Sequence, residues 1–312
     1  MTMSFVTLTL NPAVDVSTAT RGVVPSHKLR CHDVRHEAGG GGINVARVLR
    51  RLGADPRAVF SSGGPIGRYL EQLVEREGIP FTAVPVAGDT REDFAIFDEN
   101  DRAQYRFVLP GPELSASEID ACIAATVRGV ERTGFVVASG SLPPAAPGDT
   151  YKRVAQALPP GARFVLDTSG NALALALGPR VTLIKPSQRE LAELVGAQVP
   201  DRAACTTAAR NIVDSGRSEM VAVSLGEEGA LFIGKGFAFD ALAPAVEPAT
   251  TVGAGDSFLA VLVWSLAQAW SPDKALRWAT AAGAAALTTP GTGLCQPDDV
   301  RRLAERVAVR AI

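Results

Sequence analysis

The stretch Thr251-Val252-Gly253-Ala254-Gly255-Asp256-Ser257-Phe258 opens an apolar segment that continues to Trp270. A Gly-Ala-Gly turn at a helix start directs backbone N–H groups at one point, where the helix dipole also favours negative charge. We therefore expect Gly253, Ala254 and Gly255 to bind an anion. Asp256 has two interpretations: a helix N-cap, or a general base beside the anion.

Outward from this stretch, short β-rich runs alternate with amphipathic segments. We expect strands at 5–10, 57–61, 134–138, 163–167, 181–184 and 220–224, and helices at 43–52, 66–77, 148–157, 187–195, 201–214, 256–270, 272–288 and 297–310. This alternation predicts an α/β fold, with a mostly parallel sheet and helices on both of its faces. Residues 229–236 match the start of a P-loop, but Gly236 stands where Ser or Thr is required, so we expect a hairpin there.

Two segments, 15–36 and 91–107, interrupt the alternation. Both look like antiparallel strands inserted between core elements. We expect them to form a small β-sheet lid, and residues 1–14, 37–90 and 108–312 to form the α/β core.

The composition excludes several classes of protein. The chain has 312 residues and a net charge of −2, so it offers no broad attraction to nucleic acid or to an anionic membrane. The apolar segment 258–270 is shorter than the ~20 residues of a membrane-spanning helix. The four cysteines are far apart, without a CxxC pair, and the start of the chain lacks an export signal, so we expect a cytoplasmic protein.

Four other motifs could bind a ligand. The run Gly39–Gly42 before Ile43-Asn44 allows close backbone approach to a ligand, although a flexible turn explains it equally well. The expected lid carries three cations, Lys28, Arg30 and Arg91, and the first two lie on one face of an expected extended strand. These side chains could bind a phosphate ester, or they could form a solvated basic edge of the sheet. Residues 185–190 and 224–229 each follow a strand, at the sheet edge where open α/β folds bind ligands.

Together with Thr9–Asp15 and Ser139–Pro144, these motifs resemble those of the ribokinase-like (PfkB) sugar kinases over nearly the whole chain. The resemblance implies a Rossmann-like core, a β lid that often forms a homodimer interface, and transfer of the ATP γ-phosphoryl group to a sugar hydroxyl. Within this family, the motifs Lys28–Cys31, Gly39–Asn44 and Gln104–Val108 resemble the branch that acts on fructose 6-phosphate. This resemblance implies that fructose 6-phosphate is the substrate and that its C1 hydroxyl is phosphorylated. The rivals of this branch, fructose-1-phosphate and tagatose-6-phosphate kinases, usually carry a lysine where this chain has Gly41.

The resemblance also implies roles for individual residues. Asp256 is the base, and Gly253, Ala254 and Gly255 neutralise the phosphoryl group in transfer. The sugar hydroxyls are assigned to Asp15, Gly40, Gly41 and Asn44, and the phosphate of the sugar to Lys28, Arg30, Arg91 and Ser141. The nucleotide is assigned to Lys185, Ser187, Ser224, Leu225, Gly226, Glu227, Glu228 and Gly229. Mg²⁺ is assigned to Glu190 through water, and a K⁺ loop to Thr250, Val252, Ala286, Thr289 and Gly291.

Two positions depart from the family pattern. Ser187 stands where the family has asparagine; its hydroxyl can still bond to a phosphate or a metal-bound water, but with a shorter reach. Gly293 stands where an arginine is usual, near the expected K⁺ loop, whose ligands are commonly backbone carbonyls. From another class of function, a non-catalytic sugar-phosphate sensor would keep this fold, but it would not need Asp256.

Overall fold

The computed structural model describes residues 3–131, 133–248, 250, 252–289, 291 and 293–312. Its elements, in chain order, are β1 (Phe5–Thr9), β2 (Ala13–Thr20), β3 (His32–Gly39), α1 (Gly41–Arg51), β4 (Pro56–Ser62), α2 (Gly64–Arg76), β5 (Phe81–Pro85), β6 (Arg91–Asp98), β7 (Ala103–Val108), α3 (Ala116–Gly129), β8 (Phe135–Ser139), α4 (Thr150–Ala157), β9 (Arg163–Asp167), α5 (Gly170–Ala176), β10 (Val181–Ile184), α6 (Gln188–Val195), α7 (Arg202–Asp214), β11 (Met220–Ser224), the 3₁₀ turn η1 (Gly226–Glu228), β12 (Ala230–Gly234), β13 (Phe237–Leu242), α8 (Ala254–Ala267), α9 (Pro272–Leu287), α10 (Pro297–Ala304) and β14 (Ala308–Ala311).

The large sheet has the strand order β14-β13-β12-β11-β10-β9-β8-β1-β4-β5. From β11 to β5 every neighbouring pair is parallel, and β12, β13 and β14 add an antiparallel edge. The predicted mostly parallel sheet is therefore confirmed, as is the hairpin at 229–236, which is formed by β12 and β13.

Helices cover both faces of this sheet. One core cluster packs α3 to α7 on one face, and two others pack α1, α2, α8, α9 and α10 on the opposite face. Strands buried on both faces explain the continuous apolar runs, such as the five fully covered residues of β1 and of β8. Among the described residues, no helix combines the length and the apolar character needed to cross a membrane.

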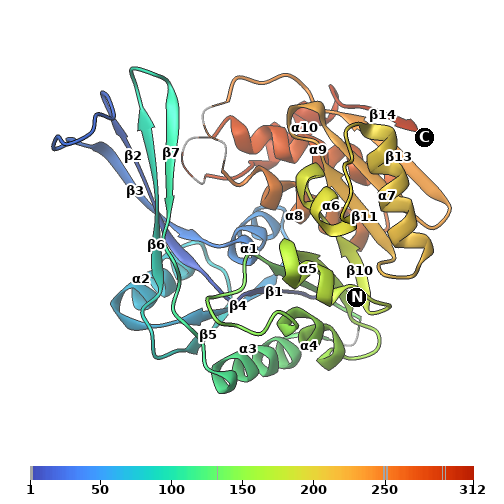
Figure 1. The fold of residues 1–312 in the computed structure, drawn as a ribbon, viewed down its shortest axis with the longest axis horizontal. Helices are drawn as coiled ribbons and strands as arrows, with labels where there is room; N and C mark the ends of the chain where they lie inside the picture. The colour runs from blue at the N-terminus through green and yellow to red at the C-terminus, as the bar shows by residue number, and fades with distance from the viewer. Residues whose placement is uncertain (1–2, 132, 249, 251, 290, 292) are drawn as a thin grey trace.

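A separate four-stranded sheet stands to one side of the core, in the order β3-β2-β6-β7 (Figure 1). Two separated chain segments build it, and the strands within each segment pair antiparallel, as predicted. The central pair, β2 and β6, joins the two segments in parallel. The reason is that β2 follows β1 and β6 follows β5; both of these strands point the same way in the large sheet.

The helix predicted over 297–310 is wrong in its second half. α10 ends at Ala304, and residues 308–311 form β14, which pairs antiparallel with β13. Val307 is buried between the two elements. Pairing with β14 gives partners to the backbone groups on the edge of β13, which a further helical turn would leave open.

Candidate active site

A cavity of about 350 Å³ lies where the carboxyl ends of β8 and β9 meet the small sheet. Many of the predicted site residues line it: Asp15, Gly40, Gly41, Asn44, Arg91, Ser141, Glu190, Val252, Gly253, Ala254, Gly255 and Asp256. Residues far apart in the sequence are thus brought to one place, which is the ligand-binding edge of an open α/β sheet.

The start of α8 forms one wall of this cavity. Gly253 is the N-cap residue, with φ at 79°, a left-handed conformation that glycine adopts without strain. The first intrahelical bond is donated by the Ser257 N–H to the Gly253 oxygen. The N–H groups of Ala254, Gly255 and Asp256 therefore have no partner within the helix, and these three residues line the cavity, as the predicted anion site requires.

Asp256 does not cap α8. It is the third residue of the helix, and its Oδ2 accepts a hydrogen bond from Nδ2 of Asn44 at 2.9 Å. Burial and the nearby charge of Asp167 raise the pKa of Asp256 to about 6, while the Asn44 hydrogen bond and Lys185 oppose the rise. A carboxylate with that pKa is ionised at neutral pH and still accepts a proton readily, as a general base requires.

The glycine run brings α1 against the end of β1. Gly40 has φ at 109°, and the Asn44 N–H donates to its oxygen at 2.9 Å, which starts the helix. A Cβ atom on Gly41 would lie 2.2 Å from Oγ of Ser139. The run is therefore a close backbone approach to the cavity and not a flexible turn.

The small sheet supplies the opposite wall. Asp15 on β2 is paired in register with Glu37 on β3 and Asp93 on β6, which brings three carboxylates together. Burial and the charge of Asp93 raise the pKa of Asp15 to about 7. Arg91 donates to Asp93 at 3.0 Å, and Arg106 on β7 also lines the cavity, so this wall carries both signs of charge.

Lys28 and Arg30 lie elsewhere in this chain. Both are exposed, and neither lines the cavity. They belong to the loop between β2 and β3, at the end of the small sheet that projects away from the helices (Figure 1). The extended strand expected at this position is wrong, because Ser26 has a positive φ and the Thr20 hydroxyl bonds the Arg30 oxygen, which holds a loop.

Lys185 lies beneath the anion site. Its Nζ is 3.1 Å from Oδ1 of Asp167, and a Cβ on Gly255 would come within 3.4 Å of it. Burial opposes its charge, but the carboxylates of Asp167, Asp256 and Glu190 outweigh this effect and raise the pKa of Lys185. A permanent positive charge thus supports the start of α8.

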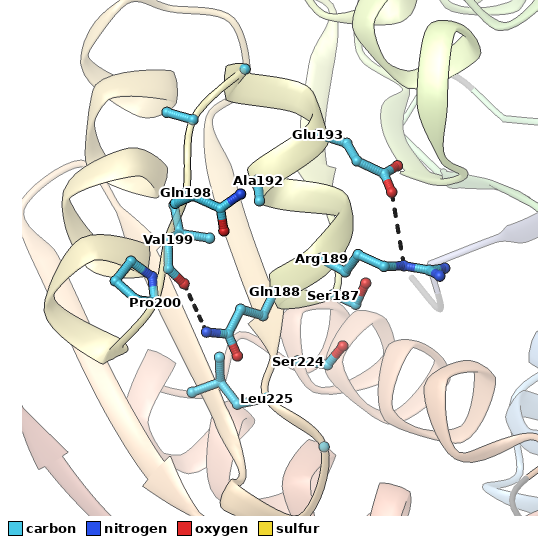
Figure 2. A pocket seen from close by; sticks show the side chains of 13 residues that line it. Ser187, Gln188, Arg189, Ala192, Glu193, Gln198, Val199, Pro200, Ser224 and Leu225 are labelled. Carbon is cyan, nitrogen blue, oxygen red and sulfur yellow. Dashed lines mark hydrogen bonds and ion pairs between the residues drawn. The ribbon is translucent and has the colours of Figure 1, made fainter.

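A second cavity, of about 830 Å³, is lined by four of the predicted nucleotide residues, Ser187, Ser224, Leu225 and Gly226, together with the loop between α6 and α7. Ser187 and Ser224 lie side by side at its edge (Figure 2). The Ser187 hydroxyl accepts from the Glu190 N–H and the Glu190 carboxylate accepts from the Ser187 N–H, at 3.3 and 2.8 Å. This capping box, absent from the sequence prediction, places Ser187 on one cavity and Glu190 on the other.

The rest of the predicted nucleotide run closes the hairpin before β12. Glu227 and Glu228 are exposed on η1 and do not line either cavity, whereas Gly229 has φ at 115° and donates to the Gly226 oxygen. Arg202 on α7 contacts both the Glu228 backbone oxygen and the buried carboxylate of Asp240, which anchors this turn.

The two segments of the expected K⁺ loop lie together. The Thr250 N–H donates to the Leu287 oxygen and the Thr289 N–H to the Ala286 oxygen, both at 3.2 Å. The Gly293 oxygen accepts from Arg51 of α1 at 2.5 Å. Thr251, Pro290 and Thr292, which belong to the same motifs, lie outside the described residues.

The sequence prediction missed six polar side chains that line this cavity: Asp93, Arg106, Ser139, Asp167, Thr168 and Ser169. Asp167 and Ser139 end two neighbouring buried strands, and that position was a usable signal. Arg106 lies within the run Gln104–Val108, but nothing local in the sequence indicates that its strand borders a cavity.

Comparison with known proteins agrees with this fold. The family model of the pfkB family carbohydrate kinases matches residues 7–299, and the chain belongs to this family. The predicted ribokinase-like fold is confirmed, and so is an ATP-dependent sugar-phosphate kinase as the class of enzyme.

Particular relatives share almost the whole chain. An ATP-dependent 6-phosphofructokinase isozyme 2 of Mycobacterium tuberculosis is 41% identical over 97% of this chain and 89% of its own length. Phosphofructokinase-2 of Escherichia coli, solved in complex with fructose-6-phosphate, is 36% identical with a TM-score of 0.91, and covers 97% of this chain and 99% of its own. That enzyme is also known in complex with potassium and in a tetrameric inhibited form. A 1-phosphofructokinase of Xanthomonas campestris is 33% identical, over the full length of both chains.

Proposed function

We propose that this protein transfers the γ-phosphoryl group of ATP to the C1 hydroxyl of fructose 6-phosphate and forms fructose 1,6-bisphosphate. One observation carries the proposal. The cavity has the half-buried carboxylate of Asp256 and the open N–H groups of α8 on one wall, and Arg91 and Arg106 on another. A sugar with a phosphate at one end and a reactive hydroxyl at the other suits such a site.

In the proposed reaction, Asp256 accepts the proton of the C1 hydroxyl as the sugar oxygen bonds to the γ-phosphorus. The bond from that phosphorus to the bridging oxygen breaks, and ADP leaves. The N–H groups at the start of α8, with Lys185 beneath them, oppose the negative charge on the phosphoryl group in transfer. Positioning and electrostatics of this kind provide most of the catalysis in phosphoryl transfer.

The identity of the sugar is supported by Gly41. A side chain at this position would meet Oγ of Ser139 at 2.2 Å, so this chain cannot hold the lysine of the rival kinases without moving Ser139. Asp15, Asn44 and the backbone of Gly40 and Gly41 are left to bind the sugar hydroxyls.

The nucleotide and metal assignments extend the proposal. Mg²⁺ keeps several waters and takes phosphate oxygens with one or two carboxylates, and Glu190 on the cavity wall fits that demand. Among the described residues, no group of three or more His, Cys, Asp or Glu side chains could hold a metal, so a Mg²⁺ bound at Glu190 would also need phosphate oxygens and waters as ligands. Mg²⁺ supplies charge neutralisation of the phosphates. K⁺ binding near Thr250 and Ala286 is part of the proposal, supported by the potassium complex of the Escherichia coli relative.

We also propose a homodimer through the small sheet, which acts as a lid. Large apolar side chains are exposed on it, among them Val34, Tyr105 and Phe107, as expected for an interface. Because Lys28 and Arg30 are far from the cavity of their own chain, a role in phosphate binding requires the site of a second copy. A cytoplasmic location, favoured by four unpaired cysteines, completes the proposal.

An ADP-release assay over fructose 6-phosphate, fructose 1-phosphate, tagatose 6-phosphate and fructose tests the proposal. We expect kcat/KM to be highest for fructose 6-phosphate. A preference for fructose 1-phosphate would contradict the assignment of the sugar. Sugar-phosphate binding without turnover would favour a sensor.

A further inference from the structure

Arg47 on α1 is a buried cation that the proposed reaction has not used. Its side chain is only 2% exposed, and its guanidinium lies 3.2 Å from Glu37 and 2.7 Å from Glu77. Glu37 belongs to β3, at the base of the small sheet, and Glu77 follows the last residue of α2. Arg47 therefore ties α1 to both neighbouring elements.

Another contact of Arg47 leads to the active site. Its Nη1 donates to the Ala38 oxygen at 3.1 Å and to Oδ1 of Asn44 at 3.3 Å. A guanidinium carries only donors, so it faces the oxygen end of the Asn44 amide. The nitrogen end is thereby directed at Asp256, whose Oδ2 accepts from it at 2.9 Å.

We propose that Arg47 is a positioning residue for the transfer: by fixing the Asn44 amide in one orientation, it holds the carboxylate of Asp256 ready to accept the substrate proton. In the reversed orientation, the amide oxygen would face the carboxylate, and the two acceptors would repel each other. The inference rests on the proposed function, because it concerns the base of that reaction.

The proposal predicts a pH effect with a definite sign. Burial raises the pKa of Asp256, and the hydrogen bond from Asn44 works against that rise by stabilising the ionised form. Loss of this bond raises the pKa further, so the acid limb of kcat/KM moves to higher pH. The other charged groups that face Asp256, from β9, the end of β10 and β7, are Asp167, Lys185 and Arg106.

Arg47→Lys tests the contact, with Arg50→Lys as a matched control. The lysine keeps a positive charge between the two glutamates, but one ammonium cannot repeat the fork of contacts made by the guanidinium. Arg50 is on the same helix, is 44% exposed and pairs with Asp55. We expect Arg47→Lys to move the acid limb up by about 0.5 pH unit or more, a loss of about threefold in kcat/KM at pH 5. The control should keep the parent profile.

A double-mutant cycle decides whether Arg47 acts through Asn44. In an Asn44→Ala background, the shift caused by Arg47→Lys should disappear. If Arg47→Lys does not fold, Arg47→Gln combined with Glu77→Gln removes both charges and takes its place. An unshifted acid limb in a folded, active variant overturns the inference, and so does a shift that persists without Asn44. An inactive parent enzyme would instead defeat the proposed function, and this inference with it.

Discussion

Asp256→Asn separates the two roles that an aspartate at the start of α8 can have. As the loss of a general base, the substitution should lower kcat by about 10²–10⁴, with KM values changed by less than about threefold. Its effect on stability is also specific. Burial raises the pKa of Asp256 from 3.8 to about 6, so the ionised carboxylate costs the folded state about 3 kcal/mol.

The sign of this effect follows from the two pKa values. The folded-state pKa lies above the unfolded one, so the cost is fully present above pH 6 and disappears as the pH falls through 3.8. Asparagine carries no charge. After the lost interaction with the helix dipole is deducted, the variant should gain about 2 kcal/mol in the free energy of unfolding at pH 8. This corresponds to about 3 °C in Tm.

Calorimetry at pH 8 and pH 5 measures the change in stability of Asp256→Asn, and an ADP-release assay measures the change in kcat. Asp273→Asn is a matched control, because Asp273 is also in the first turn of a helix but has a lowered pKa, caused first by its hydrogen bond with Ser271. The control should lower Tm slightly and keep kcat. If Asp256→Asn loses about 1 kcal/mol and keeps kcat, as expected for a removed helix cap, the reasoning is refuted.

The sugar site, the nucleotide side and the glycine run each give one further test. Arg91→Ala and Arg106→Ala should each raise KM for fructose 6-phosphate about tenfold and leave KM for ATP unchanged, because a charge-assisted contact is worth about 1.5–3 kcal/mol. Initial-rate measurements that give an unchanged sugar KM would contradict a role of these arginines in phosphate binding. Ser187→Ala should lose about 1 kcal/mol of stability and bind ATP more weakly, whereas Ser187→Asn should keep the helix cap and bind ATP more tightly. Equal ATP affinities of the two variants and the parent, measured by titration calorimetry, would exclude a role of Ser187 in nucleotide binding. Gly41→Ala brings a Cβ to 2.2 Å from Oγ of Ser139, so sugar affinity should fall about tenfold or more; parent affinity would mean that Ser139 moves freely.

Local signals predicted the core and one wall of the site. Strands such as β8 are apolar runs bounded by turn residues, and the Gly253–Gly255 turn marks the start of α8 in its own sequence. Other features depend on contacts distant in sequence. The parallel direction of β2 and β6 follows from the strands before them, and the end of α10 follows from the open edge of β13. Asp167 belongs to the site only because β9 lies beside β8, and Lys28 misses the cavity because its loop extends beyond the small sheet.

The central claim is that the hydroxyl facing Asp256 is on C1 of fructose 6-phosphate. The most direct measurement is ³¹P and ¹³C NMR of the product formed from ¹³C-labelled fructose 6-phosphate and ATP by the purified protein. We predict a single product with a new phosphate ester on C1 and the original ester still on C6. No new ester, or an ester on another carbon, would contradict the account.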